Sequence, residues 1–367
     1  MQIDFANLKI QHNLYKEEIE EAILKVARDC NFIMGSQIDE LERNLEKFTG
    51  SKYAISCSSG TDALLLAMMA LDIQPDDEII TTPFTFFATA ETIAFLKAKP
   101  VFVDIDEKTY NIDPKKIEEK ITPKTKAIIP VSLYGQPADM DEINQIAKKY
   151  NLKVIVDGAQ SFGSTYKGIS DSNLGDISCT SFFPAKPLGC YGDGGALFTN
   201  DEKLADKIKS LRLHGQSIRY HHQYIGMGGR LDTIQAAVLN VKLKYYEKDL
   251  KLRQDVAAKY TKALNEKNIE TPFVKSDRTS AWAQYSIRVQ NRTELQTKLQ
   301  NLGIPTAVHY PMPLHVQECF KYLNLKEGDF PISEKVSKEI MSLPMNPYVS
   351  DEEIEFIVEN LAKELRC

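Results

Sequence analysis

The chain has 367 residues, of which 43% are hydrophobic and 26% charged, and its formal net charge is −6. This is ordinary globular composition, long enough for two domains. The slightly acidic balance argues against nucleic acid as a partner. No apolar run approaches the roughly 20 residues of a membrane span, and the first residues lack a signal-peptide pattern. We therefore expect a cytoplasmic protein that binds neither nucleic acid nor a membrane.

The cysteines show no CxxC spacing and no pairing with histidine at metal-ligand spacing. In a chain of this size they are predicted to be free, mostly buried thiols of a reducing compartment, and no metal site is expected. They are Cys30, Cys57, Cys179, Cys190, Cys319 and Cys367.

Apolar residues at helical spacing predict two amphipathic helices near the start of the chain, over Tyr15–Asn31 and Ser36–Phe48. A strand is predicted over Tyr53–Ser56, and an apolar helix follows a turn of small residues, over Ser58–Leu71.

The start of that apolar helix is a candidate phosphate site. Free backbone N–H groups at a helix start, with Gly60 and the hydroxyl of Thr61, suit a phosphate. An ordinary capped helix, with Ser59 and Thr61 as capping residues, explains the same residues.

Strands and helices then alternate along the chain. The predicted strands are Glu78–Thr82, Pro100–Ile105, Ala127–Leu133, Lys153–Val156, Ile177–Phe183 and Gly195–Thr199, and the predicted helices are Phe87–Lys97, Pro114–Lys120, Met140–Tyr150 and Glu202–Arg212. This alternation predicts an α/β fold with a parallel sheet covered on both faces. In such sheets the ligand lies beyond the carboxyl ends of the strands.

Two features fall at predicted strand ends. Aromatic residues gather in Phe84–Thr89; they are typical of a core, but Phe86 is a candidate platform for a flat ring. Asp157 follows an apolar strand, where a carboxylate is either a helix cap or a functional charge.

Lys186 lies between Pro184 and Pro187, in a loop between two predicted strands. Apolar surroundings disfavour the ammonium form and lower the pKa of an amine, which makes it a nucleophile for Schiff-base chemistry. A solvated surface lysine is the alternative.

A polar loop over His214–Arg230 is too long for a simple turn, and a binding role is plausible. A helix over Thr233–Leu264 is predicted to bridge a large domain, residues 1–245, and a small one, residues 246–367. The small domain alternates again, with strands over Ala283–Val289 and Thr306–His309 and helices over Glu294–Leu302 and Glu352–Arg366.

One cofactor explains these separate features together. Pyridoxal 5'-phosphate (PLP) needs a phosphate cradle, a ring platform, an anion at its ring nitrogen and a lysine for its aldehyde. The candidates for these roles are Gly60 with Thr61, Phe86, Asp157 and Lys186.

The sequence also resembles a known family. The stretches SSGTDALLLAMMAL, DEIITTPFTFFATAETI, VIVDGAQSFGSTYKG, TSFFPAKPLGCYGDGGALFTN, RLDTIQAAVL and GIPTAVHYPMPLH are similar to those of the DegT/DnrJ/EryC1/StrS sugar-nucleotide aminotransferases. The resemblance implies PLP fold type I, the aspartate aminotransferase-like fold. This fold has a large, mostly parallel sheet domain and a smaller C-terminal α/β domain.

The resemblance implies a role for each site residue. Lys186 would form the Schiff base and move the proton, Asp157 would pair with the ring nitrogen, and Gln160 would bond the ring's 3'-oxygen. Phe86 would stack on the ring. The phosphate would be held by Gly60, Thr61 and Ser181.

The family's members are homodimers with shared active sites, to which the loop His214–Arg230 would contribute. The family usually has an asparagine two residues before Arg230, where this chain has Gly228. The contact of that asparagine with the phosphate is therefore in doubt here, or another group supplies it.

The nearest likeness is to enzymes that aminate C3 of UDP-2-acetamido-2-deoxy-3-keto-glucuronate, with L-glutamate leaving as 2-oxoglutarate. This would place the chain in the synthesis of lipopolysaccharide or O-antigen precursors. The sugar's C6 carboxylate needs cationic or donor partners. Arg230 and His309 are candidates, with Tyr310 beside them.

Other readings stay open. A dTDP- or UDP-linked keto-6-deoxyhexose is the alternative substrate. A sugar dehydratase is disfavoured because those relatives replace the lysine by histidine, and a non-catalytic PLP-binding regulatory protein is the remote alternative. His221 and His222 stay undecided between a structural and a functional role, whereas His12 and His315 are expected to be structural.

Overall fold

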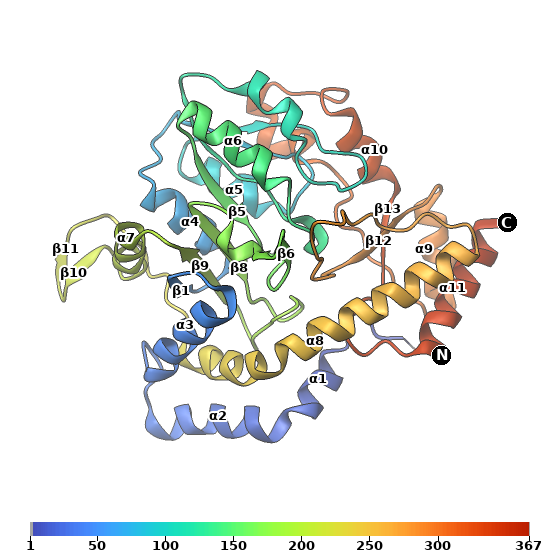
Figure 1. Ribbon diagram of the computed structural model, residues 1–367, viewed down its shortest axis with the longest axis horizontal. Helices are drawn as coiled ribbons and strands as arrows, with labels where there is room; N and C mark the ends of the chain where they lie inside the picture. The colour runs from blue at the N-terminus through green and yellow to red at the C-terminus, as the bar shows by residue number, and fades with distance from the viewer. Residues whose placement is uncertain (1–2, 367) are drawn as a thin grey trace.

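The computed structural model describes residues 3–366 and is built around a seven-stranded sheet (Figure 1). Its strand order is β1 (Tyr53–Cys57), β9 (Gly195–Thr199), β8 (Ile177–Ser181), β5 (Lys153–Asp157), β4 (Thr125–Ile128), β2 (Glu78–Thr81) and β3 (Lys99–Phe102). All neighbouring strands pair in parallel except around β9, which runs antiparallel to both β1 and β8. The α/β fold with a large, mostly parallel sheet is therefore confirmed.

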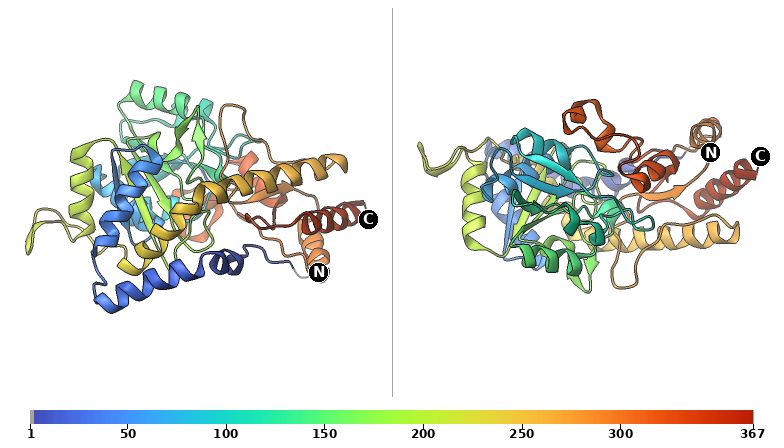
Figure 2. Two further views of the ribbon diagram at one scale, coloured as in Figure 1. Left: turned by 60° about the horizontal axis from the view of Figure 1, so that its bottom comes forward. Right: turned by 90° about the horizontal axis from the view of Figure 1, so that it is seen from above.

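Helices cover both faces of this sheet (Figures 1 and 2). One face packs against α4 (Gly60–Ala70), α5 (Ala88–Phe95) and α7 (Glu202–Arg212), and the other against α3 (Ser36–Thr49), α6 (Met140–Tyr150) and the first half of α8 (Thr233–Glu266). Successive strand residues point to opposite faces. Thus Ile79 joins the core under α4, whereas Ile80 joins the core under α6.

The second half of α8 enters a separate core. There it packs with the antiparallel pair β12 (Tyr285–Arg288) and β13 (Ile340–Leu343), and with α9 (Arg292–Asn301) and α11 (Asp351–Arg366). Helix α8 is unbroken across residue 245, so the division at that residue stays a prediction.

The remaining elements are short. They are α1 (Leu8–Leu14), α2 (Lys16–Asp29), α10 (Pro331–Glu339), the strand pairs β6 (Thr165–Tyr166) with β7 (Ile169–Ser170) and β10 (Gln216–Ile218) with β11 (His221–His222), and the 3-10 turns Pro114–Lys116, Glu118–Lys120, Leu133–Gly135, Asp171–Asn173, Leu314–Val316 and Glu318–Leu323. The hairpin β10–β11 projects from the body, and Ile225 just after it is 92% exposed (Figures 1 and 2).

The strand predicted over Thr306–His309 is wrong. Only Ala307 pairs with a strand residue, Ser342, in an isolated bridge. Prolines at 305 and 311 bound the segment, and a proline cannot donate to a strand ladder. The helix predicted over Pro114–Lys120 is two 3-10 turns instead.

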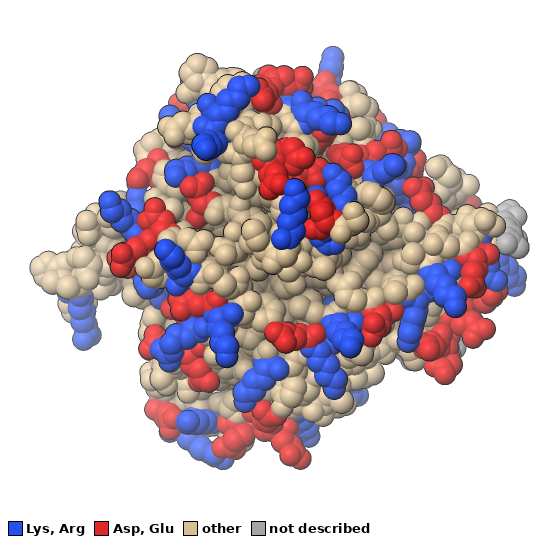
Figure 3. Space-filling view, in the orientation of Figure 1, with Lys and Arg blue, Asp and Glu red and all other residues tan. Residues whose placement is uncertain are grey.

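On the face shown in Figure 3, acidic and basic side chains are interspersed without a large patch of one sign. Among residues 3–366, no helix is long and apolar enough to cross a membrane.

Candidate active site

Loops at the carboxyl ends of the strands enclose a cavity of about 510 Å³. All predicted site residues except Arg230 line it: Gly60, Thr61, Phe86, Asp157, Gln160, Ser181, Lys186, His309 and Tyr310. Segments as far apart in the chain as Ser59 and Tyr310 therefore meet at one edge of the sheet.

Lys186 lies in a tight turn after β8. Its backbone N–H donates to the Phe183 carbonyl at 2.8 Å. A Cβ at Gly189 would lie 2.4 Å from the Pro184 carbonyl oxygen, so only glycine closes this turn. Lys186 as a whole residue is half-buried because it lines an open cavity. Burial nevertheless lowers the pKa of its amine, and the charge of Asp157 opposes that shift. The direction is the one expected from the sequence.

Asp157 is the last residue of β5 and is only 5% exposed. Its Oδ2 accepts from the Thr89 hydroxyl at 2.7 Å, and its Oδ1 accepts from the Ala159 N–H at 3.2 Å. Burial raises the pKa of this carboxyl, while these hydrogen bonds and Lys186 act the other way. Residues 159–163 form turns, so there is no helix here for Asp157 to cap. Asp157 is an oriented carboxyl group that lines the cavity.

The start of α4 offers an anion cradle. Ser59 caps the helix by accepting from the Asp62 N–H at 3.0 Å, which leaves the N–H groups of Gly60 and Thr61 at the cavity. A Cβ on Gly60 would lie 2.7 Å from the Cβ of Ser181, so glycine lets the end of β8 approach. Backbone N–H groups with the hydroxyls of Thr61 and Ser181 suit a phosphate.

Gln160 and Phe86 form two further walls. The Gln160 side chain accepts from the Tyr134 backbone N–H at 2.6 Å and donates to the Tyr310 hydroxyl at 3.0 Å. Phe86 is 56% exposed, and its ring centre lies 6.0 Å from that of Tyr310. An exposed aromatic face at a cavity is free to stack on a flat ring.

His309 is held by its neighbours rather than left free. Its Nδ1 lies 2.8 Å from the Ser342 hydroxyl, and its carbonyl accepts a hydrogen bond from the Tyr134 hydroxyl. Burial, with a smaller contribution from Lys186, lowers the pKa of His309 to about 4. At neutral pH His309 can therefore contact a substrate only as a neutral hydrogen-bonding group. Of the cationic and donor roles suggested by the sequence for binding a carboxylate, only the neutral donor role remains.

Arg230 lies apart from the cavity. The carbonyl of the preceding residue, Gly229, accepts from the Ser58 N–H at 3.0 Å, which places this loop beside the start of α4. A Cβ on Gly228 would lie 3.1 Å from the His214 ring, so His214 takes part of the space a side chain would need there.

The other histidines lie away from the cavity. His315 is buried and bonds Glu334 at 2.9 Å, His12 bonds the Tyr191 hydroxyl at 2.7 Å, and His221 and His222 lie on the exposed strand β11. Among the described cysteines, Cys57, Cys179 and Cys190 are buried, whereas Cys30 and Cys319 are exposed; all are free. Cys367 lies outside the described residues.

Several residues at or near the site were not predicted from the sequence. The Thr89 hydroxyl orients Asp157 and is itself hydrogen-bonded to the Thr85 hydroxyl at 3.0 Å. The spacing of four residues between Thr85 and Thr89 at a helix start could have indicated that these two side chains meet. Lys242, a residue of α8, donates to the Gly189 carbonyl at 2.7 Å. Gln284 lines the cavity just before β12, and nothing in the local pattern distinguished it.

The cavity thus combines an anion cradle, an exposed aromatic face, a buried carboxylate and an amine with a lowered pKa. Their chemistry matches the phosphate, the ring, the ring nitrogen and the aldehyde of pyridoxal phosphate, so the residues present fit this cofactor.

Comparisons with known proteins show which family the chain resembles. The model of the DegT/DnrJ/EryC1/StrS aminotransferase family matches residues 13–362. The UDP-2-acetamido-2-deoxy-3-oxo-D-glucuronate aminotransferase of Pseudomonas aeruginosa is 52% identical over 97% of this chain and 98% of its own. A pleiotropic regulatory protein of Geobacillus stearothermophilus is 44% identical over 99% and 98%. The crystal structure of NtdA from Bacillus subtilis with bound cofactor PMP superposes with a TM-score of 0.92 at 32% identity, over 100% of this chain and 86% of that one.

Proposed function

This chain belongs to the DegT/DnrJ/EryC1/StrS aminotransferase family, and we propose on that basis that it moves the amino group of L-glutamate to C3 of UDP-2-acetamido-2-deoxy-3-keto-glucuronate. The chain is a PLP-dependent sugar-nucleotide aminotransferase. The observation that carries the specific substrate is the 52% identity, along 97% of the chain, to an enzyme named for the 3-oxo-glucuronate. The product is a precursor of lipopolysaccharide or a similar surface polysaccharide.

In this proposal bound pyridoxal phosphate would supply a carrier for the amino group between the donor and the keto sugar. Gly60, Thr61 and Ser181 would hold its phosphate, and Phe86 would stack on its ring. The carboxylate of Asp157 would pair with the ring nitrogen. Gln160 would bond the 3'-oxygen through an amide group that Tyr134 and Tyr310 already orient.

Lys186 is the proton carrier. A lowered pKa makes its Nζ easier to deprotonate. The neutral amine would take the proton from the donor's Cα, and in the half-reaction with the sugar Nζ would deliver a proton to C3 of the sugar. The cavity around this amine is lined mainly by uncharged groups.

The sugar's C6 carboxylate is assigned to Arg230, with His309 and Tyr310 as neutral partners. Arg230 lies outside the cavity of its own chain, so this role needs the loop His214–Arg230 of a second subunit. The proposal therefore includes a homodimer with shared active sites. We also place the enzyme in the cytoplasm.

A substrate panel tests the proposal. Purified protein with L-glutamate should aminate the UDP-linked 3-keto-hexuronate with a kcat/KM at least about tenfold above that for dTDP-linked 3- or 4-keto-6-deoxyhexoses, because only the hexuronate supplies a carboxylate for arginine. Equal or better turnover of a 6-deoxyhexose would contradict the substrate assignment. Binding of PLP without turnover of any sugar would favour a regulatory role instead.

A further inference from the structure

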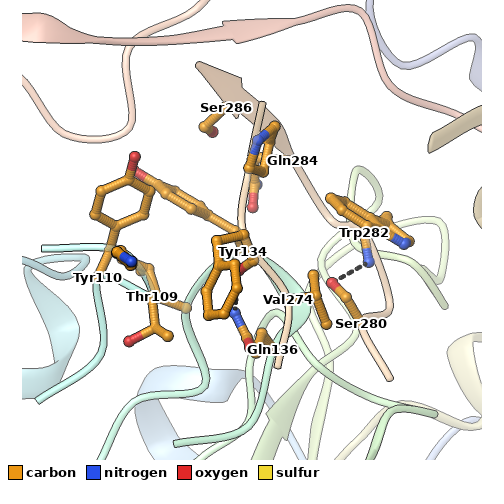
Figure 4. A pocket seen from close by; sticks show the side chains of 13 residues that line it. Thr109, Tyr110, Tyr134, Gln136, Val274, Ser280, Trp282, Gln284 and Ser286 are labelled. Atoms are coloured by element: carbon orange, nitrogen blue, oxygen red, sulfur yellow. Dashed lines mark hydrogen bonds between the residues drawn. The ribbon is translucent and has the colours of Figure 1, made fainter. Parts of the chain in front are cut away.

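Gln284 lies between the candidate active-site cavity and a second, smaller cavity. It lines the 510 Å³ cavity with Lys186 and His309, and also a cavity of about 20 Å³ bounded by Tyr134 and Trp282. Figure 4 shows Gln284 and Ser286 on the same segment above Tyr134. Gln284 is therefore placed at the boundary of the substrate space.

The side-chain oxygen of Gln284 is buried and has no hydrogen-bond partner among residues 3–366. The neighbouring polar groups are already occupied. The Ser286 hydroxyl bonds that of Ser342 at 2.9 Å, and Ser342 bonds His309 at 2.8 Å. A buried acceptor without a partner is costly, so a turn of the amide group that brings this oxygen to a donor of a bound ligand is favourable.

We propose that the Gln284 carboxamide binds the sugar ring of the acceptor substrate, accepting a hydrogen bond from a ring hydroxyl or from the acetamido N–H. This inference rests on the function proposed above and adds a specificity-determining residue to it. L-glutamate is the poorer match, because its side-chain and α-carboxylates bring only acceptors to a buried carbonyl oxygen. Gln284 therefore acts in the half-reaction with the sugar.

Separating the two half-reactions tests this role. In Gln284→Ala, kcat/KM for the nucleotide sugar should fall at least about tenfold, mainly through a higher KM, because a buried polar contact is lost. The rate at which L-glutamate converts bound cofactor should stay within about twofold of wild type, since no contact made in that half-reaction changes. Calorimetry with the amino-sugar nucleotide product as the probe should show a matching loss of affinity.

Gln290→Ala is the matched control, because Gln290 lies just after the same strand but is exposed and away from the cavity. If Gln284→Ala does not fold, Gln284→Asn, which keeps the amide but shortens its reach, should show the same split between the half-reactions.

Unchanged sugar kinetics in Gln284→Ala would overturn the inference. That result would indicate that Gln284 only binds a water molecule in the small cavity. An equal loss in both half-reactions would overturn it too. If the wild type aminates no nucleotide sugar, the proposed function fails together with the inference; if the wild type is active and the variant matches it, the inference alone fails.

Discussion

At Lys186 and Asp157, burial acts on two opposite charges across one cavity. It lowers the pKa of the amine and raises the pKa of the carboxyl, and each charge partly offsets the shift of the other. Thr89 and the Ala159 N–H favour the ionised carboxylate. Burial thus makes the lysine easier to deprotonate, while the hydrogen bonds to Asp157 and the charge of Lys186 favour the carboxylate form that would pair with a cationic ring nitrogen.

Asp157→Asn should lower kcat by about two orders of magnitude, because a neutral amide cannot stabilise a protonated ring nitrogen. Steady-state kinetics at saturating cofactor measures this. Thr89→Val is the graded comparison: it removes one hydrogen bond from the carboxylate and should cost much less. Wild-type turnover in Asp157→Asn would contradict the assigned role.

The pH profile of activity should show no ionisation of His309 above pH 5.5. Since its pKa is lowered to about 4, the folded protein holds it neutral, whereas the unfolded chain takes up a proton near pH 6.5. Its contribution to stability is therefore present above pH 6.5 and is lost as the pH falls toward 4.

Denaturant unfolding of wild type and His309→Gln at pH 7 and pH 5 measures this contribution. The variant should lose less stability than wild type between these two values. A steeper loss in the variant would show that His309 is charged in the folded protein.

The elements of the sheet were largely predictable, and those of the small domain were predictable in part: β12, α9 and α11 lie where they were expected. Strand β9 and helices α6 and α7 have the predicted bounds, because their apolar periodicity agrees with their burial. The predictions missed α10 and β13, since Pro331 opens the helix and the strand follows it without a turn. In the site, the phosphate-binding residues at the start of α4 and Lys186 could be predicted from local sequence patterns. The contacts of Gln284 and Lys242 depend on tertiary packing alone.

Helix α8 supports the turn that carries Lys186. Lys242 is 4% exposed, and burial lowers its pKa to about 8 while its amine bonds the Gly189 carbonyl at 2.7 Å. Lys242→Met leaves that carbonyl unpaired, which should destabilise the protein by about 1–3 kcal/mol.

Thermal unfolding and kcat together check this effect, because a loosened turn also misplaces Lys186. Lys244→Met is the control on the same helix, since Lys244 is exposed and pairs only with Glu18 at 3.1 Å. Equal melting temperatures for the two variants would argue against a supporting role for Lys242.

At the scale of the whole molecule, two features need a common explanation: the projecting hairpin β10–β11, and Arg230, which does not line the cavity. A cavity that holds nearly every predicted site residue lacks the arginine assigned to the substrate. Ile218, Tyr220 and Ile225 around the hairpin are 65%, 76% and 92% exposed, which is unusual for large apolar side chains on a monomer. A second subunit would both cover these side chains and supply the arginine.

Subunit complementation tests shared sites. Lys186→Ala and Arg230→Ala should each be nearly inactive alone. A random mixture of their chains should regain about a quarter of wild-type activity, because half the dimers are mixed and each mixed dimer has one complete site. No recovery in verified mixed dimers would mean that Arg230 serves its own chain.

The transfer of nitrogen itself is the most direct measurement of the central claim. The wild type is incubated with ¹⁵N-labelled L-glutamate and UDP-2-acetamido-2-deoxy-3-keto-glucuronate, and the product is examined by NMR. We expect ¹⁵N bonded to C3 of an intact UDP-hexuronate, one 2-oxoglutarate formed for each amine, and no transfer by Lys186→Ala. Label at C4, no label in the UDP-hexuronate, or equal transfer by Lys186→Ala would contradict the account.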